Sequence, residues 1–179
     1  SVPTFLADSP AAQLFIALCL ISINGWFVLA EFALVRLRAS RVEIMARKGH
    51  RMGALLQEML RNLDLYLSAV QLGITMASLA LGWIGEPAVA RILESYLGGM
   101  PYFSGKAFTH TLSFVVAFGT ITFMHILFGE LVPRSIAIQK AEVMAVWTAL
   151  PLKLFAEVFR LPISIMAGLS MRLLALMRI

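Results

Sequence analysis

The sequence predicts an all-α membrane protein with three transmembrane helices, short cytoplasmic helices after the first, and a C-terminal amphipathic juxtamembrane helix. Of its 179 residues, 60% are hydrophobic and only 14% are charged, whereas globular proteins carry about 25% charged residues. Three apolar stretches have the length of about 20 residues that spans a bilayer as a helix. Basic residues gather in the loop after the first stretch, as the positive-inside rule predicts for a cytoplasmic loop. We expect a three-span domain over residues 1–140 and a juxtamembrane helix over 141–179.

Composition and motifs argue against other classes of protein. The net charge is +5, but no Lys/Arg run interleaved with aromatic residues predicts nucleic-acid binding. Cys19 is the single cysteine, so neither a disulfide framework nor a cysteine-based metal site is expected. The sequence has no Gly-x-Ser-x-Gly elbow, no His-Glu-x-x-His motif and no Walker loop. We therefore expect no enzyme.

The first span is predicted from Ala11 to Val35, and it carries three polar residues. Asn24 and Glu31 are seven residues apart and share a helix face. Ser22 and Asn24 face nearly opposite ways unless the helix is kinked between them. Either these groups contribute to a cation site, or they make ordinary backbone bonds and helix–helix contacts.

The loop after the first span is predicted to be cytoplasmic, which puts the N-terminus outside. Its basic residues are Arg36, Arg38, Arg41, Arg47, Lys48 and Arg51. Ser40-x-x-Glu43 is typical of a capping box that begins a short helix, and Gly49 is predicted to end it. Residues 51–61 are predicted to form a second short amphipathic helix.

The second span is predicted from Leu65 to Gly85. Its polar and small residues fall on one stripe at about 100° per residue, with Gly73 off the stripe; they are Ser68, Gln71, Thr75, Ser78 and Gly82. The stripe faces either other helices or water, and a plain packing seam is the alternative. Residues 86–107 are predicted to form an outer connection, broken by Pro87 and containing a short surface helix over 92–97.

The third span, predicted from Phe108 to Leu131, leads into Phe128-Gly129-Glu130-Leu131-Val132-Pro133. Pro133 has no N–H and cannot bond the carbonyl of Gly129, four residues back. A carboxylate on Glu130 and a free carbonyl then lie together, and Mg²⁺ and Ca²⁺ prefer such oxygen ligands. The alternative is a simple helix kink or stop. His125 shares a helix face with Gly129. It is either a proton relay or metal ligand, or a histidine whose hydrogen bonds are made within the helix bundle.

The last segment, residues 142–179, has its charged residues on one helix face. We predict an amphipathic helix along the inner interface, bent at Pro151 and Pro162. The alternative is a fourth span. The pattern is still helical at Ile179, which suggests that a longer chain continues in the cytoplasm.

Three motifs resemble those of the CorC/CNNM transporters. Asn24-Gly25-Trp26-Phe27-Val28-Leu29-Ala30-Glu31-Phe32-Ala33 is similar to the Asn-x-Phe-Phe-Val-x-x-Glu-x-Ala pattern of their first span. Ser68-Ala69-Val70-Gln71-Leu72-Gly73 is similar to their second span. Gly129-Glu130-Leu131-Val132-Pro133-Arg134 resembles their Gly-Glu-x-x-Pro-Lys/Arg signature. Order and spacing match over roughly residues 10 to 140.

The resemblance implies a homodimeric Mg²⁺ transporter of the plasma (inner) membrane, mainly an exporter, with Na⁺ proposed as the coupling ion. It implies cytoplasmic CBS-type domains that this chain does not contain. Carried over by motif position, the implied metal-site residues are Ser22, Asn24, Ser68, Gly129 and Glu130, with Gly73 and Gln71 in addition. Animal relatives have Ser in place of Asn24 and Asn in place of Glu31, so the roles of these two positions differ within the family.

Two other functions fit the same residues. One is a membrane anchor or sensor whose polar stripes are dimer seams and which transports nothing. The other is a transporter of another divalent cation, in which His125 relays protons.

Overall fold

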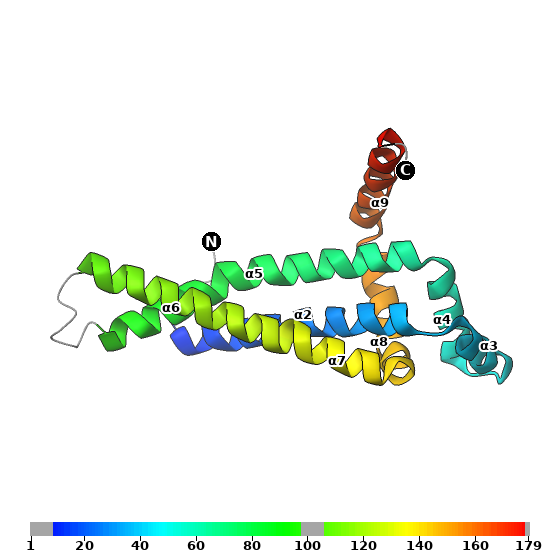
Figure 1. The fold of residues 1–179 in the computed structure, drawn as a ribbon, viewed down its shortest axis with the longest axis horizontal. Helices are drawn as coiled ribbons and strands as arrows, with labels where there is room; N and C mark the ends of the chain where they lie inside the picture. The colour runs from blue at the N-terminus through cyan, green and yellow to red at the C-terminus, as the bar shows by residue number, and fades with distance from the viewer. Residues whose placement is uncertain (1–8, 98–105, 178–179) are drawn as a thin grey trace. The chain divides into compact units, whose positions relative to one another are not determined.

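The computed structural model describes residues 9–97 and 106–177, and these are helical almost throughout (Figure 1). The described elements are α2 (Pro10–Arg36), α3 (Ala39–Arg47), α4 (Arg51–Arg61), α5 (Leu63–Leu97), α6 (Lys106–Ile126), η1 (Leu127–Leu131), α7 (Val132–Gln139), α8 (Ala141–Val158) and α9 (Arg160–Leu176). No strand occurs within these ranges. The all-α prediction is confirmed.

Within the described residues, three helical stretches are long and apolar enough to cross a membrane. They are Ala11–Arg36, Leu63–Leu93 and His110–Gln139. The pair α8 and α9 would make a fourth only if it formed one span, and the two helices are bent by 84°. The chain is therefore a membrane protein with the three predicted spans.

The described chain divides into two compact units. The first unit takes its described residues from Ser1–Gly25 and Met76–Val132, and the second from Trp26–Thr75 and Pro133–Ile179. Helices α2 and α5 each contribute one part to each unit.

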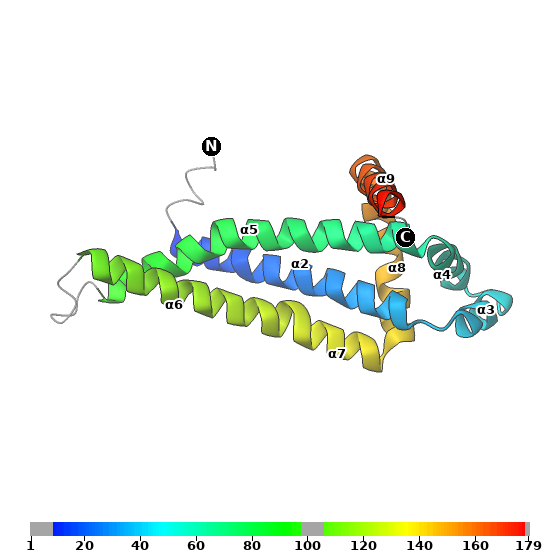
Figure 2. The same cartoon turned by 45° about the horizontal axis from the view of Figure 1, so that its top comes forward.

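In the first unit, the early part of α2, the later part of α5 and α6 lie side by side (Figures 1 and 2). Ala17, Ile21 and Leu81 form a small buried core, and Ile121 and Met124 of α6 pack against it. Large apolar side chains also face outward, and Trp83 is 80% exposed. Lipid can cover such side chains, because the acyl chains of a bilayer are as apolar as the side chains themselves.

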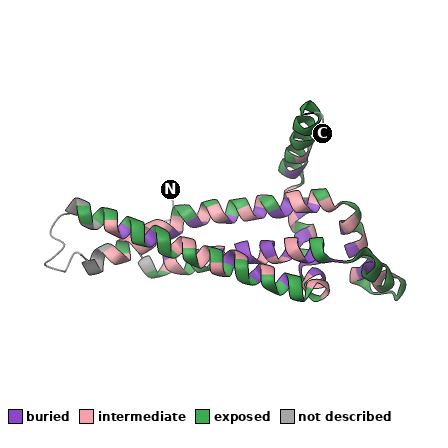
Figure 3. Ribbon diagram, in the orientation of Figure 1, coloured by how far each residue is buried: buried purple, intermediate pink, exposed green. Residues whose placement is uncertain are grey.

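In the second unit, the larger core joins the later part of α2, the early part of α5, and helices α4 and α8. Leu34, Leu56 and Leu152 are fully or almost fully buried in it. The rings of Phe27 and Phe155 meet edge to face, with centroids 4.8 Å apart. Helix α9 is exposed over nearly its whole length (Figure 3).

The two short helices predicted after the first span form where expected, but the predicted capping box is wrong. Helix α3 begins at Ala39, and Arg38 is its N-cap without a side-chain bond. Glu43 instead accepts a bond from Arg47 at 2.6 Å. The end at Gly49 is as predicted: its φ is +74°, and the N–H of His50 reaches the carbonyl of Met45 at 3.1 Å, which is a Schellman motif.

The second span is longer than predicted. Helix α5 continues through Pro87 to Leu97, so the predicted break at Pro87 and the separate helix over 92–97 are wrong. A proline removes one helix bond, and membrane helices tolerate this where neighbouring groups compensate. The remaining predicted breakers of the connection, Gly98, Gly99, Pro101 and Gly105, lie outside the described residues.

The third span also continues past its predicted end at Leu131. A five-residue π turn, η1, leads directly into α7, which ends at Gln139. The last segment bends once at Phe159, between α8 and α9. Helix α8 continues through Pro151, and Pro162 lies in the first turn of α9, where no N–H is required. The predicted bends at the two prolines are therefore replaced by one break before Pro162.

Candidate functional site

The helix that contains Pro133 forms a π turn, η1, just before the proline. Over Leu127–Leu131 the helix widens, and the N–H of Val132 donates to the carbonyl of Leu127, five residues back. Pro133 supplies no N–H, so the buried carbonyl of Gly129 receives none from the residue four positions later. A π turn within an α-helix is frequent at functional sites.

The side chain of Asn24 donates a hydrogen bond to this carbonyl. Its Nδ2 donates to the carbonyl oxygen of Gly129 at 2.9 Å, and Ser78 Oγ donates to its Oδ1 at 3.1 Å. The Asn24 side chain is fully buried. One side chain of α2 therefore bonds both α5 and η1, all within the first unit.

His125 completes this group of polar side chains. A Cβ placed on Gly129 would lie 2.7 Å from His125 Cδ2 and 3.2 Å from Asn24 Nδ2. The ring of His125 therefore lies directly on the glycine, and within the described part of the chain its buried Nε2 has no hydrogen-bond partner. We call Asn24, Ser78, His125 and Gly129 the Asn24 cluster.

A cavity of about 330 Å³ adjoins this cluster, and Ser78 and His125 line it. Glu86 and Thr122 add polar groups, while Phe114 and other apolar side chains form the remaining wall. A water molecule occupies about 30 Å³ in the liquid, so the cavity has room for a hydrated cation.

The other two predicted metal-site residues of the first unit, Glu130 and Ser22, differ in burial. Glu130 follows Gly129 in η1 and is partly buried. Ser22 is exposed, and its Oγ donates to the carbonyl of Leu18 in its own helix at 2.8 Å. Helix α2 is unbroken at Gly25, so Asn24 is buried in the cluster and Ser22 is not part of it.

The three remaining candidates belong to the second unit. Ser68 and Gln71 line a cavity of about 470 Å³ together with Glu31 and Asp64, and Ser68 Oγ donates to the carbonyl of Asp64 at 2.8 Å. Gly73 is buried, and a Cβ there would lie 2.4 Å from the ring of Phe27. Its observed contact is therefore a packing contact.

Sequence reasoning did not assign Ser78 and Glu86 to a site. Ser78 could have been found, because it lies on the predicted polar stripe of the second span, seven residues after Gln71. Nothing in the sequence distinguishes Glu86. Within the described residues no three His, Cys, Asp or Glu side chains gather as a metal site. An ion held at this cluster would depend on carbonyl, amide and hydroxyl oxygens beside a carboxylate.

Comparison with known proteins places these residues in a family context. Residues 15–179 match the family described as the Cyclin M transmembrane N-terminal domain. The chain is similar to the UPF0053 protein YugS of Bacillus subtilis, 42% identical over 148 residues, which cover 82% of the chain and 34% of the relative. The UPF0053 protein YhdT of B. subtilis is 44% identical over 138 residues, covering 76% and 29%.

A more distant relative is the uncharacterized protein Rv1841c of Mycobacterium tuberculosis, which is 35% identical over 147 residues, covering 81% of the chain and 40% of the relative. The chain thus spans about a third of the length of these relatives.

Proposed function

This chain belongs to the cyclin M (CNNM) transmembrane domain family, and from this premise we propose that it carries magnesium ions across the membrane. In this proposal Mg²⁺ is the cargo, moves outward and is coupled to Na⁺. It binds within the membrane, largely without its water, to oxygen atoms that include those of Asn24, Gly129 and Glu130. Ser22, Ser68, Gln71 and Gly73 remain predicted ligands on the family resemblance.

The observation that carries the proposal is the bond between Asn24 and the carbonyl of Gly129. Pro133 removes the N–H that would bond this carbonyl in an α-helix, and the Asn24 amide that donates to it could rotate away. Rotation of the Asn24 amide would exchange its N–H for its oxygen, which an ion can use as a ligand. Glu130, the next residue after Gly129, supplies negative charge, and hard oxygen ligands suit Mg²⁺. One carboxylate with neutral oxygens favours weak, reversible binding, as transport requires.

The test is calorimetric titration of the purified full-length protein with Mg²⁺, beside flux into proteoliposomes. We expect Glu130→Gln to lose specific binding, at least tenfold in affinity, and to lose flux. Glu157→Gln is the matched control, because it removes one exposed carboxylate of α8 and should bind as the wild type does. Equal Mg²⁺ affinity of wild type and Glu130→Gln would remove Glu130 from the site.

We also propose a homodimer in the plasma (inner) membrane, with the N-terminus outside and a CBS-type domain following in the cytoplasm. A cysteine-free variant (Cys19→Ala) would receive a single cysteine at Ser9 or at Lys48. An impermeant maleimide should label position 9 in intact cells and position 48 only after permeabilisation. The reverse pattern contradicts the orientation.

A second candidate is transport of another divalent cation with proton exchange. It is favoured by the buried Nε2 of His125, which has no hydrogen-bond partner among the described residues. His125→Gln distinguishes the two. Magnesium flux that is unchanged by this substitution and independent of a pH gradient contradicts proton exchange. If Ser68→Ala abolishes dimerisation and leaves Mg²⁺ binding intact, the anchor function is favoured instead.

A further inference from the structure

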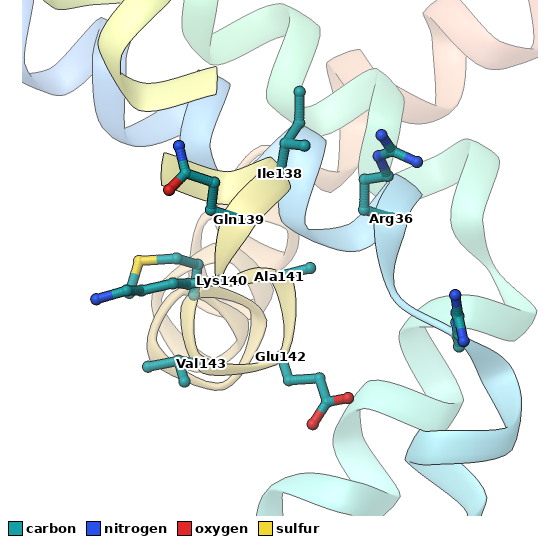
Figure 4. A pocket seen from close by; sticks show the side chains of 9 residues that line it. Arg36, Ile138, Gln139, Lys140, Ala141, Glu142 and Val143 are labelled. Atoms are coloured by element: carbon teal, nitrogen blue, oxygen red, sulfur yellow. The ribbon is translucent and has the colours of Figure 1, made fainter. Parts of the chain in front are cut away.

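We propose that a basic pocket at one end of the second unit binds the phosphate headgroup of an anionic phospholipid. The pocket lies where α2 ends, α7 ends and α8 begins, and its volume is about 760 Å³ (Figure 4). Arg36 and Arg38 come from the end of α2, and Lys140 comes from the α7–α8 junction. Residues a hundred positions apart in the sequence thus bring three cationic side chains to one hollow. This inference is independent of the transported ion.

The charge of the pocket is not neutralised by its own residues. Arg36, Arg38 and Lys140 are exposed, and none of them makes an ion pair with a described residue. Glu142 is the carboxylate among the described lining residues. It accepts a bond from Arg41 Nε at 2.7 Å, and this bond raises the pKa of Arg41. Because Glu142 is already paired, the pocket presents a net positive charge, and guanidinium and ammonium groups are the usual partners of phosphate.

The start of α8 adds hydrogen-bond donors to this charge. Lys140 is the N-cap residue of α8, and the N–H of Met144 is bonded to its carbonyl at 3.0 Å. The N–H groups of Ala141 to Val143 precede that bond and have no intrahelical acceptor, as in the first turn of every helix. Ala141, Glu142 and Val143 all line the pocket. Such a helix start favours an anion.

The position of the pocket along the chain favours a lipid over a soluble phosphate. Two of the membrane-crossing stretches end here, one at Arg36 and the other at Gln139, so the pocket lies at the depth of lipid headgroups. Two apolar side chains that line the pocket are exposed beside the cationic groups: Ile138 is 42% exposed and Val143 54%. A headgroup phosphate could bind Arg36, Arg38 and Lys140 while its acyl chains cover this apolar rim. Basic pockets between spans on the cytoplasmic side are known to bind anionic headgroups.

The experiment is native mass spectrometry of the full-length protein in detergent, titrated with phosphatidylglycerol or with phosphatidylcholine. We expect saturable binding of phosphatidylglycerol and at least tenfold weaker binding of phosphatidylcholine. The triple variant Arg36→Gln/Arg38→Gln/Lys140→Gln should lose at least tenfold in phosphatidylglycerol affinity. The triple variant Lys48→Gln/Arg51→Gln/Arg61→Gln is the matched control, because it removes the same charge from exposed residues that do not line the pocket.

The outcomes distinguish lipid binding at the pocket from non-specific attraction of anionic lipid to the positively charged protein. Loss in the pocket variant with retention in the control supports the site, and an equal loss in both overturns it. Displacement of phosphatidylglycerol by inorganic phosphate at millimolar concentration overturns the lipid assignment, because it would identify a soluble phosphate ligand. Arg36→Lys/Arg38→Lys keeps the charge, so lipid binding near the wild-type level is expected. A loss there equal to that of the glutamine variant would show that positive charge at these positions does not determine lipid binding, and it would overturn the inference.

Discussion

Asn24 and Gly129 lie 105 residues apart in the sequence and are joined by a hydrogen bond of 2.9 Å from the side-chain amide to the backbone carbonyl. Pro133 removes the N–H that would bond this carbonyl in an α-helix, and the π turn η1 is the form the backbone takes there. The same amide accepts a bond from Ser78. One buried side chain thus connects α2, α5 and η1, and the three elements should lose stability together when it is changed.

Replacing Asn24 by leucine should therefore destabilise the protein. The substitution leaves the Gly129 carbonyl and the Ser78 hydroxyl without their partner, and an unsatisfied buried polar group costs about 1–3 kcal/mol. Thermal unfolding in detergent, followed by tryptophan fluorescence, should show a lower transition temperature. Ser22→Ala is the control, because the Ser22 hydroxyl bonds only its own helix in the described structure; equal transition temperatures for Asn24→Leu and Ser22→Ala would contradict the prediction.

Gly129→Ala should be damaging for a steric reason. The added Cβ would lie 2.7 Å from His125 Cδ2, so the His125 ring must move, and overpacking of this kind costs about 1–3 kcal/mol. Gly119→Ala is the matched control, because nothing lies within 4 Å of a Cβ at Gly119 in α6. Alanine favours a helix by up to about 1 kcal/mol over glycine, so this control should be neutral or stabilising. The comparison is made by thermal unfolding, and a similar response of both variants would argue against the close His125 contact.

A packing role for Gly73 predicts rescue by a second substitution. A Cβ at Gly73 would lie 2.4 Å from the Phe27 ring, so Gly73→Ala should lower the unfolding temperature and Gly82→Ala, in open space on the same helix, should not. Adding Phe27→Leu to Gly73→Ala should recover part of the loss, because the smaller side chain leaves room for the new methyl group. If Mg²⁺ binding fails while stability is unchanged, Gly73 acts as a ligand site and not through packing.

The ion pair between Lys153 and Glu58 should make stability depend on alkaline pH. Lys153 Nζ lies 3.2 Å from Glu58 Oε2, and this hydrogen bond and charge raise the pKa of Lys153. Because the pKa of Lys153 is raised in the folded state, the ion pair stabilises the fold fully at pH values below the pKa of lysine in the unfolded chain, about 10.4. This stabilisation is lost as the pH rises through the pKa of the folded state. The unfolding-temperature difference between wild type and Glu58→Gln should therefore shrink as the pH rises above about 10.4.

Glu142→Gln is the control for this pH dependence. Its partner Arg41 stays protonated over the same range, because the bond to Glu142 raises a pKa that is already high. The difference between wild type and Glu142→Gln should stay constant while that for Glu58→Gln narrows. Parallel behaviour of the two variants would show that the pH effect does not come from Lys153.

The three spans could be predicted because length and apolar composition determine whether a helix can cross a bilayer. Their ends could not be predicted in the same way. Pro87 and Pro133 were expected to interrupt helices, yet α5 continues to Leu97 and the third span continues to Gln139. A proline removes one bond, and the sequence does not show whether a π turn or a neighbouring group compensates. Tertiary context therefore decides these positions.

The polar cluster was predictable only in part. The free carbonyl of Gly129 follows from Pro133, because the position of a proline fixes which carbonyl loses its partner. The pairing of this carbonyl with Asn24 does not follow, since it requires the register between two spans. Ser22 and Asn24 were expected to face nearly opposite ways unless the helix is kinked, and the sequence does not show which of them is buried. The unbroken α2 exposes Ser22 and buries Asn24.

Pro133→Ala tests most directly whether the carbonyl of Gly129 binds the ion or only joins the helices. Alanine restores an N–H that can bond the carbonyl of Gly129 within its own helix, so η1 should shift towards a regular α-helix and Asn24 should lose its acceptor. The backbone gains one bond, but the buried Asn24 amide loses its acceptor, so we expect a lower unfolding temperature than in the wild type and a smaller decrease than in Asn24→Leu, which leaves two polar groups unpaired. Mg²⁺ affinity should also fall at least tenfold if this carbonyl is a ligand, measured by calorimetry on the full-length protein. Pro151→Ala, at a proline inside α8, should leave binding unchanged, and undiminished affinity in Pro133→Ala would exclude the carbonyl of Gly129 from the ion's path.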